Sequence, residues 1–403
     1  MTDHTERSSV AGSTQLIVVL AMLSTFAPFA TDMYLPAFAQ MAEAYQTNHG
    51  KIEATLSTFF LGLACGQAIY GPVIDRFGRK LPLMAGISLF GLATLGCLMT
   101  RNIELFTALR FVQAVGGCAG MIIGRAVIHD LYGPRESARV LSLMLMLMTL
   151  APILAPILGG WIVTTIGWQA IFVFLLAFAA LCLAMVALLV PETLSPDRRN
   201  ALDVASVLKG YGSLMRRPRF MVPAVAGGMA QASMFAFITG SPFIFMGRFG
   251  FTEQQYSFVF GATAFGLMAG AQVNRMALRK VGVPTMLSVA LGVNLVAVIA
   301  LNLMAATDQP FLLMLPLWFV IASLGMIGGN AAAIAMNASG QHPGTASALV
   351  GILQFAFAFT VSSLVAASQN GTAYPMTVAM LTVAVLGSSL WFIATRGGTQ
   401  QQG

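Results

Sequence analysis

Residues 71–80, GPVIDRFGRK, form a short charged segment between two long apolar runs at residues 52–72 and 81–99. Each run is long enough to cross a bilayer as a helix, since a spanning helix needs roughly 20 apolar residues. Gly78 allows the left-handed backbone that a sharp reversal of the chain often requires. The segment therefore predicts a tight turn, at one face of a membrane, between two antiparallel helices.

Apolar runs of the same kind recur along the whole chain. The composition agrees with a membrane protein, because 57% of the 403 residues are hydrophobic and 9% are charged, whereas soluble domains carry about 25% charged residues. The sequence thus predicts an all-α membrane protein. We expect twelve transmembrane helices, at residues 16–38, 52–72, 81–99, 103–128, 138–164, 168–190, 220–246, 254–272, 283–305, 311–336, 345–367 and 375–394.

The first run has an alternative interpretation as a secretory signal, because residues 37–39 resemble a cleavage site. Asp3 and Glu6 leave no basic region ahead of the run, and the run is longer than the apolar part of a signal peptide. We therefore expect it to be retained as the first span.

The distribution of Lys and Arg predicts the orientation. Of the 21 such residues, Lys51, Arg101 and Arg248 fall on one side of the predicted topology, Arg110 falls inside a helix, and all others fall on the side of the N-terminus. Basic residues mark the cytoplasmic side. We expect a multi-pass protein of a bacterial inner membrane with both termini in the cytoplasm. The net charge of +7 then faces anionic lipid and requires no nucleic-acid partner.

One polar stretch divides the predicted helices into six and six. We predict an N-terminal six-helix bundle at residues 1–190, a cytoplasmic linker at 191–219 and a C-terminal six-helix bundle at 220–403. The segment GPVIDR at 71–76 resembles GAQVNR at 270–275, which follows the second helix of the other half. Two parallel repeats related by an axis along the membrane normal would give this pattern.

Asp32 and Arg110 are the candidate residues for proton coupling. Their predicted depths in the membrane, in the first and fourth helices, agree within about one helical turn. Ionisable residues in spans usually face a cavity and pair. Two interpretations remain open: a proton-binding carboxylate near a fixed cation, or a structural ion pair between two helices.

Only the acid of this pair can carry a proton. A carboxyl group holds its proton more tightly when buried and less tightly beside an arginine, so a helix movement can switch it. A guanidinium group does not lose its proton in proteins. We therefore expect Asp32 to bind the coupled proton.

The charged turn is a candidate conformational latch. Asp75 can cap a neighbouring helix, and Arg79 can reach Asp130 at the inner end of the fourth helix. The alternative is that these are the basic residues usual in cytoplasmic loops, an interpretation that explains the Arg and Lys residues but not Asp75 or the glycines. We expect the latch to stabilise the state in which the cytoplasmic ends of the halves meet, and to comprise Gly71, Asp75, Arg76, Gly78, Arg79 and Asp130.

The fifth helix holds a proline and glycine motif. Two prolines inside one helix predict a kink, and small residues allow close packing of helices. Simple packing and a role in a rocking motion are both open interpretations. The motif residues are Pro152, Pro156, Gly159 and Gly160.

Aromatic and amide side chains are concentrated in several spans and predict a loosely selective pocket. The alternative is that many of them face lipid. We expect small, largely apolar substrates that are neutral or weakly cationic. The candidate substrate-binding residues are Tyr34, Arg110, Gln113, Phe235, Phe237, Tyr256, Phe260, Gln354 and Phe355.

Several motifs are missing from the sequence. It has no ATP-binding glycine-rich motif and no zinc-protease motif, and its four histidines are scattered. The four cysteines have no metal-ligand spacing. We expect no enzyme activity, no cofactor and no metal, and a protein that works as a monomer in the lipid bilayer.

Three of these motifs together resemble the signatures of the major facilitator superfamily. They are residues 71–80, LRFVQAVG at 109–116, and APILAPILGG at 151–160, which is typical of antiporters but has Ala155 where glycine is usual. In addition, TDMYLP at 31–36, PETL at 191–194 and GSPF at 240–243 resemble the Bcr/CflA group.

The resemblance covers the whole chain and implies a function. Members of the Bcr/CflA group are proton-driven exporters of bicyclomycin, chloramphenicol, sulfonamides and related compounds. In similar antiporters an acid of the first helix and an arginine of the fourth helix govern protonation and substrate binding, and the resemblance implies these roles for Asp32 and Arg110. Some relatives hold a second acid earlier in the first helix, but residues 22–26 contain none, so coupling through one acid is implied. The alternatives are export of a metabolite, such as a nucleoside or amino acid, and a non-transporting scaffold or sensor.

Overall fold

The computed structural model describes residues 14–199, 204–340 and 343–399, and within these ranges the chain forms helices and connecting loops without a β-strand. The elements are α2 (Thr14–Ser24), α3 (Phe26–Asp32), η1 (Leu35–Ala37), α4 (Phe38–Ala44), α5 (His49–Phe77), α6 (Lys80–Met99), α7 (Ile103–Leu131), α8 (Pro134–Thr165), α9 (Gln169–Leu189), η2 (Pro196–Arg198), α10 (Val204–Met215), α11 (Pro218–Pro242), η3 (Phe243–Arg248), α12 (Glu253–Ala277), α13 (Val283–Leu303), α14 (Pro310–Asn337), α15 (Pro343–Ala367) and α16 (Tyr374–Thr399).

The described helices confirm the predicted all-α membrane fold. Eleven are long and apolar enough to span a bilayer, and the bent pair Gln15–Ser24 with Phe26–Ala44 makes a twelfth. Most of the observed helices extend beyond the predicted runs, whereas α9 and α13 are shorter than theirs by two residues. The first 13 residues, which carry Asp3 and Glu6, lie outside the described part of the chain.

Local sequence signals explain where several helices begin. Asn48 and Asn102 accept hydrogen bonds from the first backbone N–H groups of α5 and α7, as good helix-capping residues do. Thr252 and Gln255 form a reciprocal capping box at the start of α12. Helices α8, α11, α13 and α14 each carry a proline in the first turn, where the missing N–H costs nothing.

The turn at residues 71–80 is shorter than we predicted. Residues 71–77 are the last turns of α5, which continues through Pro72, and only Gly78 and Arg79 separate α5 from α6. Gly78 has a φ of 86°, a conformation that favours glycine. Its missing side chain also leaves room for the Glu192 carboxylate, which packs directly against it.

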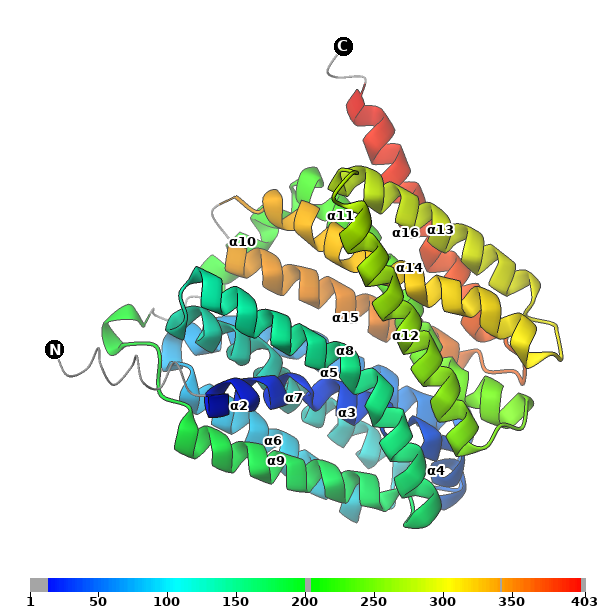
Figure 1. Cartoon of the computed structure of the whole chain (residues 1–403). Coiled ribbons are helices and arrows are strands. Elements are labelled where there is room, and N and C mark those ends of the chain that lie inside the picture. Colours follow the sequence, from blue (N-terminus) through cyan, green and yellow to red (C-terminus); the bar gives the residue numbers. More distant parts are fainter. Residues whose placement is uncertain (1–13, 200–203, 341–342, 400–403) are drawn as a thin grey trace.

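The spans form two groups that pack along each other. We call α2–α9 the first half and α11–α16 the second half; Figure 1 shows the first half below and the second half above. Contacts between the halves run mainly through α5 with α15 and α8 with α12. The domain boundaries at residues 190 and 220 stay a prediction. Helix α10 lies in the linker between them and packs on α11 and α15.

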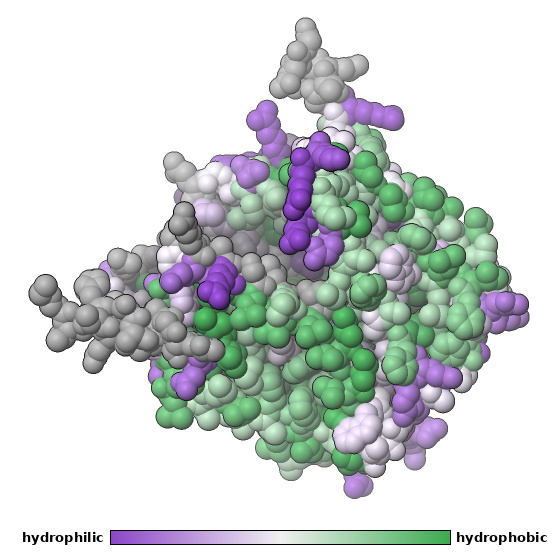
Figure 2. Space-filling view, in the orientation of Figure 1, coloured by the Kyte–Doolittle hydropathy of each residue, from purple (hydrophilic) through white to green (hydrophobic). Residues whose placement is uncertain are grey.

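The surface of the spans is suited to lipid. Figure 2 shows hydrophobic side chains over most of one face and hydrophilic ones toward its edges. Large apolar side chains such as Leu188 (83% exposed) and Phe311 (77% exposed) point outward, and without water in a bilayer core this exposure costs little. We call the end that carries Arg79, Asp130 and α10 the basic end, and the opposite end, where α4 meets α5, the far end.

Candidate functional site

The first span is broken at two places, and prolines explain both breaks. A helical N–H bonds to the carbonyl four residues back, so Pro28 leaves the Ser24 carbonyl without that partner and Pro36 does the same to Asp32. Helix α2 ends at Ser24 and α3 ends at Asp32, and residues 15–24 meet the longer segment 26–44 at 40°. Asp32 therefore lies at a helix end inside the protein.

The hydrogen bonds around Asp32 fit a protonated carboxyl group. Asp32 is 3% exposed, and its Oδ1 lies 2.8 Å from the Thr31 hydroxyl, which also lies 2.9 Å from the Ala27 carbonyl. A hydroxyl group has one proton to donate. If Asp32 is protonated, its O–H donates to Thr31 and Thr31 donates to Ala27, so both contacts are satisfied. If Asp32 is ionised, Thr31 satisfies only one acceptor.

Arg110 does not pair with Asp32. The ion pairs among the described residues do not include either side chain, so the structural ion pair of our second interpretation is absent. Arg110 is fully buried, and its Nη2 donates to the Ala30 carbonyl at 2.7 Å. The arginine thus holds the backbone of α3 two residues before Asp32, and not the carboxylate itself.

Aromatic rings surround the Arg110 guanidinium group. Its central carbon lies 4.5 Å from the ring centre of Tyr34 and 4.4 Å from that of Phe59, at distances where a cation is attracted to a ring face. Nη1 donates to Gln113, whose amide in turn donates to Thr94 at 2.7 Å. Nε of Arg110 is buried without a partner among the described residues. Arg110 is therefore a fixed cation with no carboxylate.

The second half contributes an aromatic wall near Asp32. Tyr256 is fully buried, hydrogen-bonds to Ser241 at 3.0 Å, and lies close enough to interact electrostatically with Asp32. Phe260 stacks on Phe237 with ring centres 5.3 Å apart. These predicted binding residues face protein, which removes the alternative that they face lipid.

The remaining predicted binding residues lie in other places. Phe235 contacts Phe60 of α5 edge-on at 4.7 Å and Phe355 of α15 at 5.9 Å. Gln354 lines a separate cavity of about 110 Å³ with Gln231, between α11, α14 and α15. The structure thus distributes the single pocket that we predicted over several clusters.

The proline and glycine motif of α8 touches both halves. A side chain at Gly159 would collide with the Met33 carbonyl at the break of the first span, and one at Gly160 would lie 2.7 Å from the Ser257 hydroxyl of α12. Ser257 donates to the carbonyl of Pro156 at 2.8 Å. Helix α8 therefore links the segment that carries Asp32 to the second half.

Arg79 binds the predicted acids at the basic end. Its Nε lies 3.0 Å from Asp130 Oδ2 and its Nη1 3.1 Å from Asp75 Oδ1. Burial lowers the pKa of the Arg79 guanidinium, but the hydrogen bonds and charges of Asp130 and Asp75 outweigh burial and raise it. These partners all lie in the first half. The latch role of Gly71, Asp75, Arg76 and Arg79 between the halves stays a prediction.

Glu192, and not Asp75, caps the start of α6, and the predicted capping role of Asp75 at another helix stays a prediction. The Glu192 carboxylate accepts hydrogen bonds from the backbone N–H groups of Arg79 at 2.8 Å and Lys80 at 3.2 Å. A carboxylate is favourable at a helix N-terminus, and Glu192 reaches it from beyond α9. Sequence spacing gave no sign of this contact, since 113 residues separate the two groups.

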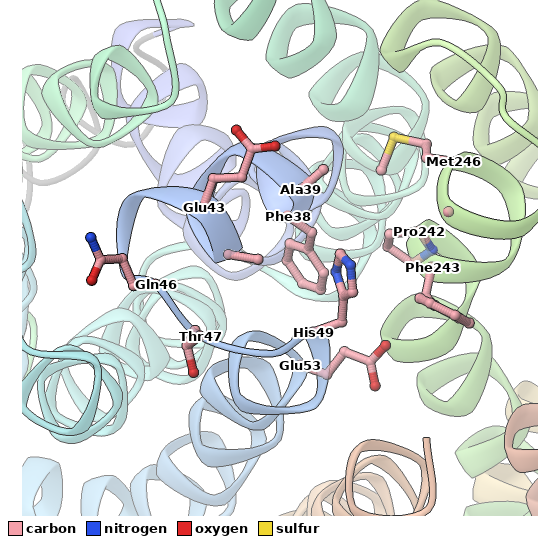
Figure 3. A pocket seen from close by; sticks show the side chains of 12 residues that line it. Phe38, Ala39, Glu43, Gln46, Thr47, His49, Glu53, Pro242, Phe243 and Met246 are labelled. Atoms are coloured by element: carbon pink, nitrogen blue, oxygen red, sulfur yellow. The ribbon is translucent and has the colours of Figure 1, made fainter. Parts of the chain in front are cut away.

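Each end of the molecule has a cavity between the halves. At the basic end a cleft of about 700 Å³ is lined by Asp75, Arg79 and Arg125 of the first half and by Tyr211 and Thr345 on the other side. At the far end a pocket of about 400 Å³ is lined by α4, α5, the end of α11 and η3 (Figure 3). Glu53 in this pocket is a buried acid that our sequence analysis missed.

Comparisons with known proteins identify the family. Residues 20–363 match the family model described as Major Facilitator Superfamily. The chain belongs to the major facilitator superfamily. A bicyclomycin resistance protein homolog of Haemophilus influenzae is 30% identical over 96% of this chain and 98% of its own length. A chloramphenicol resistance protein of Pseudomonas aeruginosa is 28% identical over 96% of this chain and 92% of its own length.

A solved structure supports the fold of this major facilitator protein. A bacterial homologue of the human lysosomal transporter Spinster, in an inward-facing and unoccupied conformation, superposes with a TM-score of 0.72 over 97% of both chains at 14% identity. Membership in the superfamily makes the chain a membrane-embedded secondary transporter and not an enzyme. Relatives at about 30% identity do not determine its substrate.

Proposed function

We propose that this major facilitator protein is a proton-coupled antiporter that exports small, largely apolar drugs across a bacterial inner membrane. Relatives named for bicyclomycin and chloramphenicol resistance support drug export. The observation that carries the proton coupling is Asp32, a buried acid beside the Thr31 hydroxyl, which can donate to the Ala27 carbonyl and still bond to Asp32 only when Asp32 is protonated.

Alternating access follows from the two ends of the molecule. The halves meet at the far end, where Ser257 bonds to α8 and Gln369 bonds to Glu53, while a cleft separates α5 and α7 from the start of α15 at the basic end. With the basic end in the cytoplasm, this is an inward-open arrangement. Substrate would then reach the centre from the cytoplasm and leave through the far end.

The proton and the substrate are coupled through α3. A substrate that packs against Tyr256 and Phe260 would disturb the nearby Asp32 and favour loss of its proton. Reciprocally, a proton that returns to Asp32 would favour release of the substrate. Arg110 holds α3 through the Ala30 carbonyl, so movement of α3 relative to α7 would change the surroundings of Asp32.

The charges predict the substrate class. The positive charge of Arg110 is already enclosed by Tyr34 and Phe59, so a strongly anionic substrate would find little unshared positive charge. Phe237, Tyr256 and Phe260 form a buried aromatic cluster, and an aromatic surface exposed there during the cycle would suit loose recognition of varied compounds. We therefore favour neutral or weakly cationic drugs.

Transport in membrane vesicles under an imposed pH gradient tests the proposal. Asp32→Asn copies the protonated acid in shape and hydrogen bonding, so the variant should insert and fold while proton-driven export falls at least about 100-fold, to the level of vesicles without the protein. A drug-susceptibility panel with and without expression supplies the candidate substrates. Undiminished active export by Asp32→Asn would remove Asp32 from the coupling.

Proton release distinguishes coupling from simple binding. Addition of a substrate to the detergent-solubilised protein in weak buffer should release protons, and the release should vanish in Asp32→Asn. Tight binding without proton release at any pH contradicts the scheme. Nucleosides and amino acids belong in the same assay, because export of one of these with no drug transport would favour the metabolite alternative.

A further inference from the structure

Glu53 is a second buried acid, at the far end of α5. It is 0% exposed, although it lies in the second turn of its helix, five residues after the cap at Asn48. An ionised carboxylate is costly to bury unless it is paired. Among the described residues, no Lys or Arg forms an ion pair with Glu53.

The one side-chain partner of Glu53 in the described part of the chain is Gln369 of the second half. Gln369 Nε2 lies 2.8 Å from Oε1 and 3.0 Å from Oε2 of Glu53. The Oε1 of Gln369 is buried and has no partner within the described residues. A neutral Glu53 would supply the missing donor, because its O–H can bond to Gln369 Oε1 while Gln369 Nε2 bonds back. An ionised Glu53 has no proton to give.

Glu53 also faces the far-end pocket between the halves. Figure 3 shows its carboxyl group pointing toward Pro242 and Phe243 of the second half, beside His49. The ring centres of His49 and Phe243 are 5.5 Å apart, so the same turn of α5 contacts the second half twice. Opening of the far end would separate these contacts and admit water to Glu53.

The other charged groups of this region lie apart from Glu53. Glu43 lines the same pocket from α4, but it is exposed and its carboxyl group points away from Glu53 in Figure 3. Lys51 is exposed on α5. Arg248 of η3 is bound to the Ala305 carbonyl and to Asp308. His49 is the remaining titratable group and must be tested together with Glu53.

We propose that Glu53 is a second proton-binding residue of the transport cycle, and that its contact with Gln369 holds the far end closed while the proton is bound. The inference rests on the proposed proton coupling and extends it to a second site. Closure buries Glu53, and burial favours the neutral acid over the carboxylate. By linkage, proton binding favours closure to the same extent. A rise in pH therefore removes the proton and opens the far end.

This arrangement gives the external proton a defined task. In an antiporter the carrier must return from the outward-open state after the drug has left. A proton taken up by Glu53 from the outside would let the far end close, so a lower external pH would favour the return. Asp32, deeper in the protein, would respond to the substrate.

Paired spin labels across the far end test the proposal. Cysteines at Lys51 and Tyr374, both exposed, replace those residues in a variant whose four native cysteines are changed to alanine. The background also carries Asp32→Asn, so the result does not depend on drug export or on titration of Asp32. The ratio of short to long distances should fall about tenfold or more between about pH 5 and about pH 9.

Three variants in this background distinguish the residues. Glu53→Gln keeps the neutral shape and can form the reciprocal amide bonds with Gln369, so short distances should dominate at every pH. Glu43→Gln and His49→Gln are the matched controls and should keep the pH response. The proposal is overturned if Glu53→Gln still responds to pH, if the response is lost in His49→Gln, or if the distances of the parent protein do not change with pH.

Discussion

At the scale of the residue, the contribution of Arg110 to stability should depend on the geometry of its side chain and not only on its charge. Arg110→Lys keeps the charge but lacks the planar guanidinium group, whose two terminal nitrogens bond separately to Ala30 and Gln113 while its face covers aromatic rings. We expect a loss of about 2–4 kcal/mol in the free energy of unfolding, from the buried hydrogen bonds and the cation–π contacts. Chemical denaturation in detergent measures it.

Two comparisons make the Arg110 test decisive. Arg101→Lys, at an exposed position near the far end, should leave both stability and export unchanged. Export by Arg110→Lys should fall as well, because α3 loses its contact to α7. If Arg110→Lys were as stable as the wild-type protein, the hydrogen bonds and ring contacts of the Arg110 guanidinium group would contribute nothing to the free energy of unfolding.

The sequence predicted that Asp32 and Arg110 are important, but it did not predict that their side chains bind different partners. Matching depths in two spans pointed to Asp32 and Arg110, and both are buried. Their directions depend on the break of the first span, and the Asp32 carboxyl group contacts the Thr31 hydroxyl. Depth along a helix follows from counting residues, whereas the direction of a side chain around a broken helix does not.

Glu53 and Glu192 were missed for a different reason. Glu53 lies at the edge of its apolar run, where a charge normally faces water, and the partner that covers it is 316 residues away. Glu192 lies in a polar linker yet caps α6. In both residues the decisive contact is long-range, and no local pattern predicts it.

At the scale of the element, Gly159 determines how closely α8 approaches the broken first span. Gly159→Ala puts a Cβ against the Met33 carbonyl, so α8 or the segment that carries Asp32 must move. We expect a loss of about 1–3 kcal/mol in stability from this overpacking and a marked fall in export. Thermal unfolding in detergent and vesicle transport measure the two effects.

Gly133→Ala is the matched control for this substitution. Gly133 precedes α8, and a Cβ there meets no atom within 4 Å among the described residues. Its stability and export should stay close to those of the parent protein. Equal effects of the two substitutions would contradict the close-packing role of Gly159.

Asp75 and Asp130 at the basic end should differ in how strongly they affect the equilibrium between the open and the closed basic end. The Asp75 side chain is 57% exposed and that of Asp130 is 25% exposed, and Asp130 also accepts a hydrogen bond from Thr193. The latch requires that these pairs are stronger when the basic end is closed, and on that basis we expect Asp75→Asn to shift the equilibrium toward the open basic end by about 0.5 kcal/mol and Asp130→Asn by about 1–2 kcal/mol. Distances between spin labels at His129 and Lys280 should show this order. The reverse order, or no shift in either variant, contradicts the latch.

At the scale of the whole molecule, the orientation in the membrane is testable by labelling. With the basic end in the cytoplasm, a cysteine in place of Ser195 should stay unlabelled by an impermeant thiol reagent in intact cells. A cysteine in place of Lys51, exposed at the far end, should react at least about tenfold faster, since the bilayer excludes the reagent from the other side. Labelling at Ser195 but not at Lys51 would reverse the topology.

The architecture was more predictable than the site because lipid imposes strong rules on composition. Residues 81–99 were predicted as a span and α6 covers Lys80–Met99; residues 345–367 were predicted and α15 covers Pro343–Ala367. The helix α10 was not predicted, because its surroundings are polar and its stability comes from packing on α15. Hydropathy thus predicts which segments enter the membrane, and not how the remainder folds back on them.

The order of protein synthesis separates the two buried ionisable sites in time. Arg110 emerges from the ribosome after Ala30, Tyr34 and Phe59, so its partners are already present when α7 enters the membrane. Glu53 precedes Gln369 by 316 residues, and at roughly 5–20 residues per second it waits about 15–60 s for that partner. A nascent chain that stops before residue 369 therefore leaves Glu53 without Gln369, and the far-end contact forms only in a chain synthesised almost to its end.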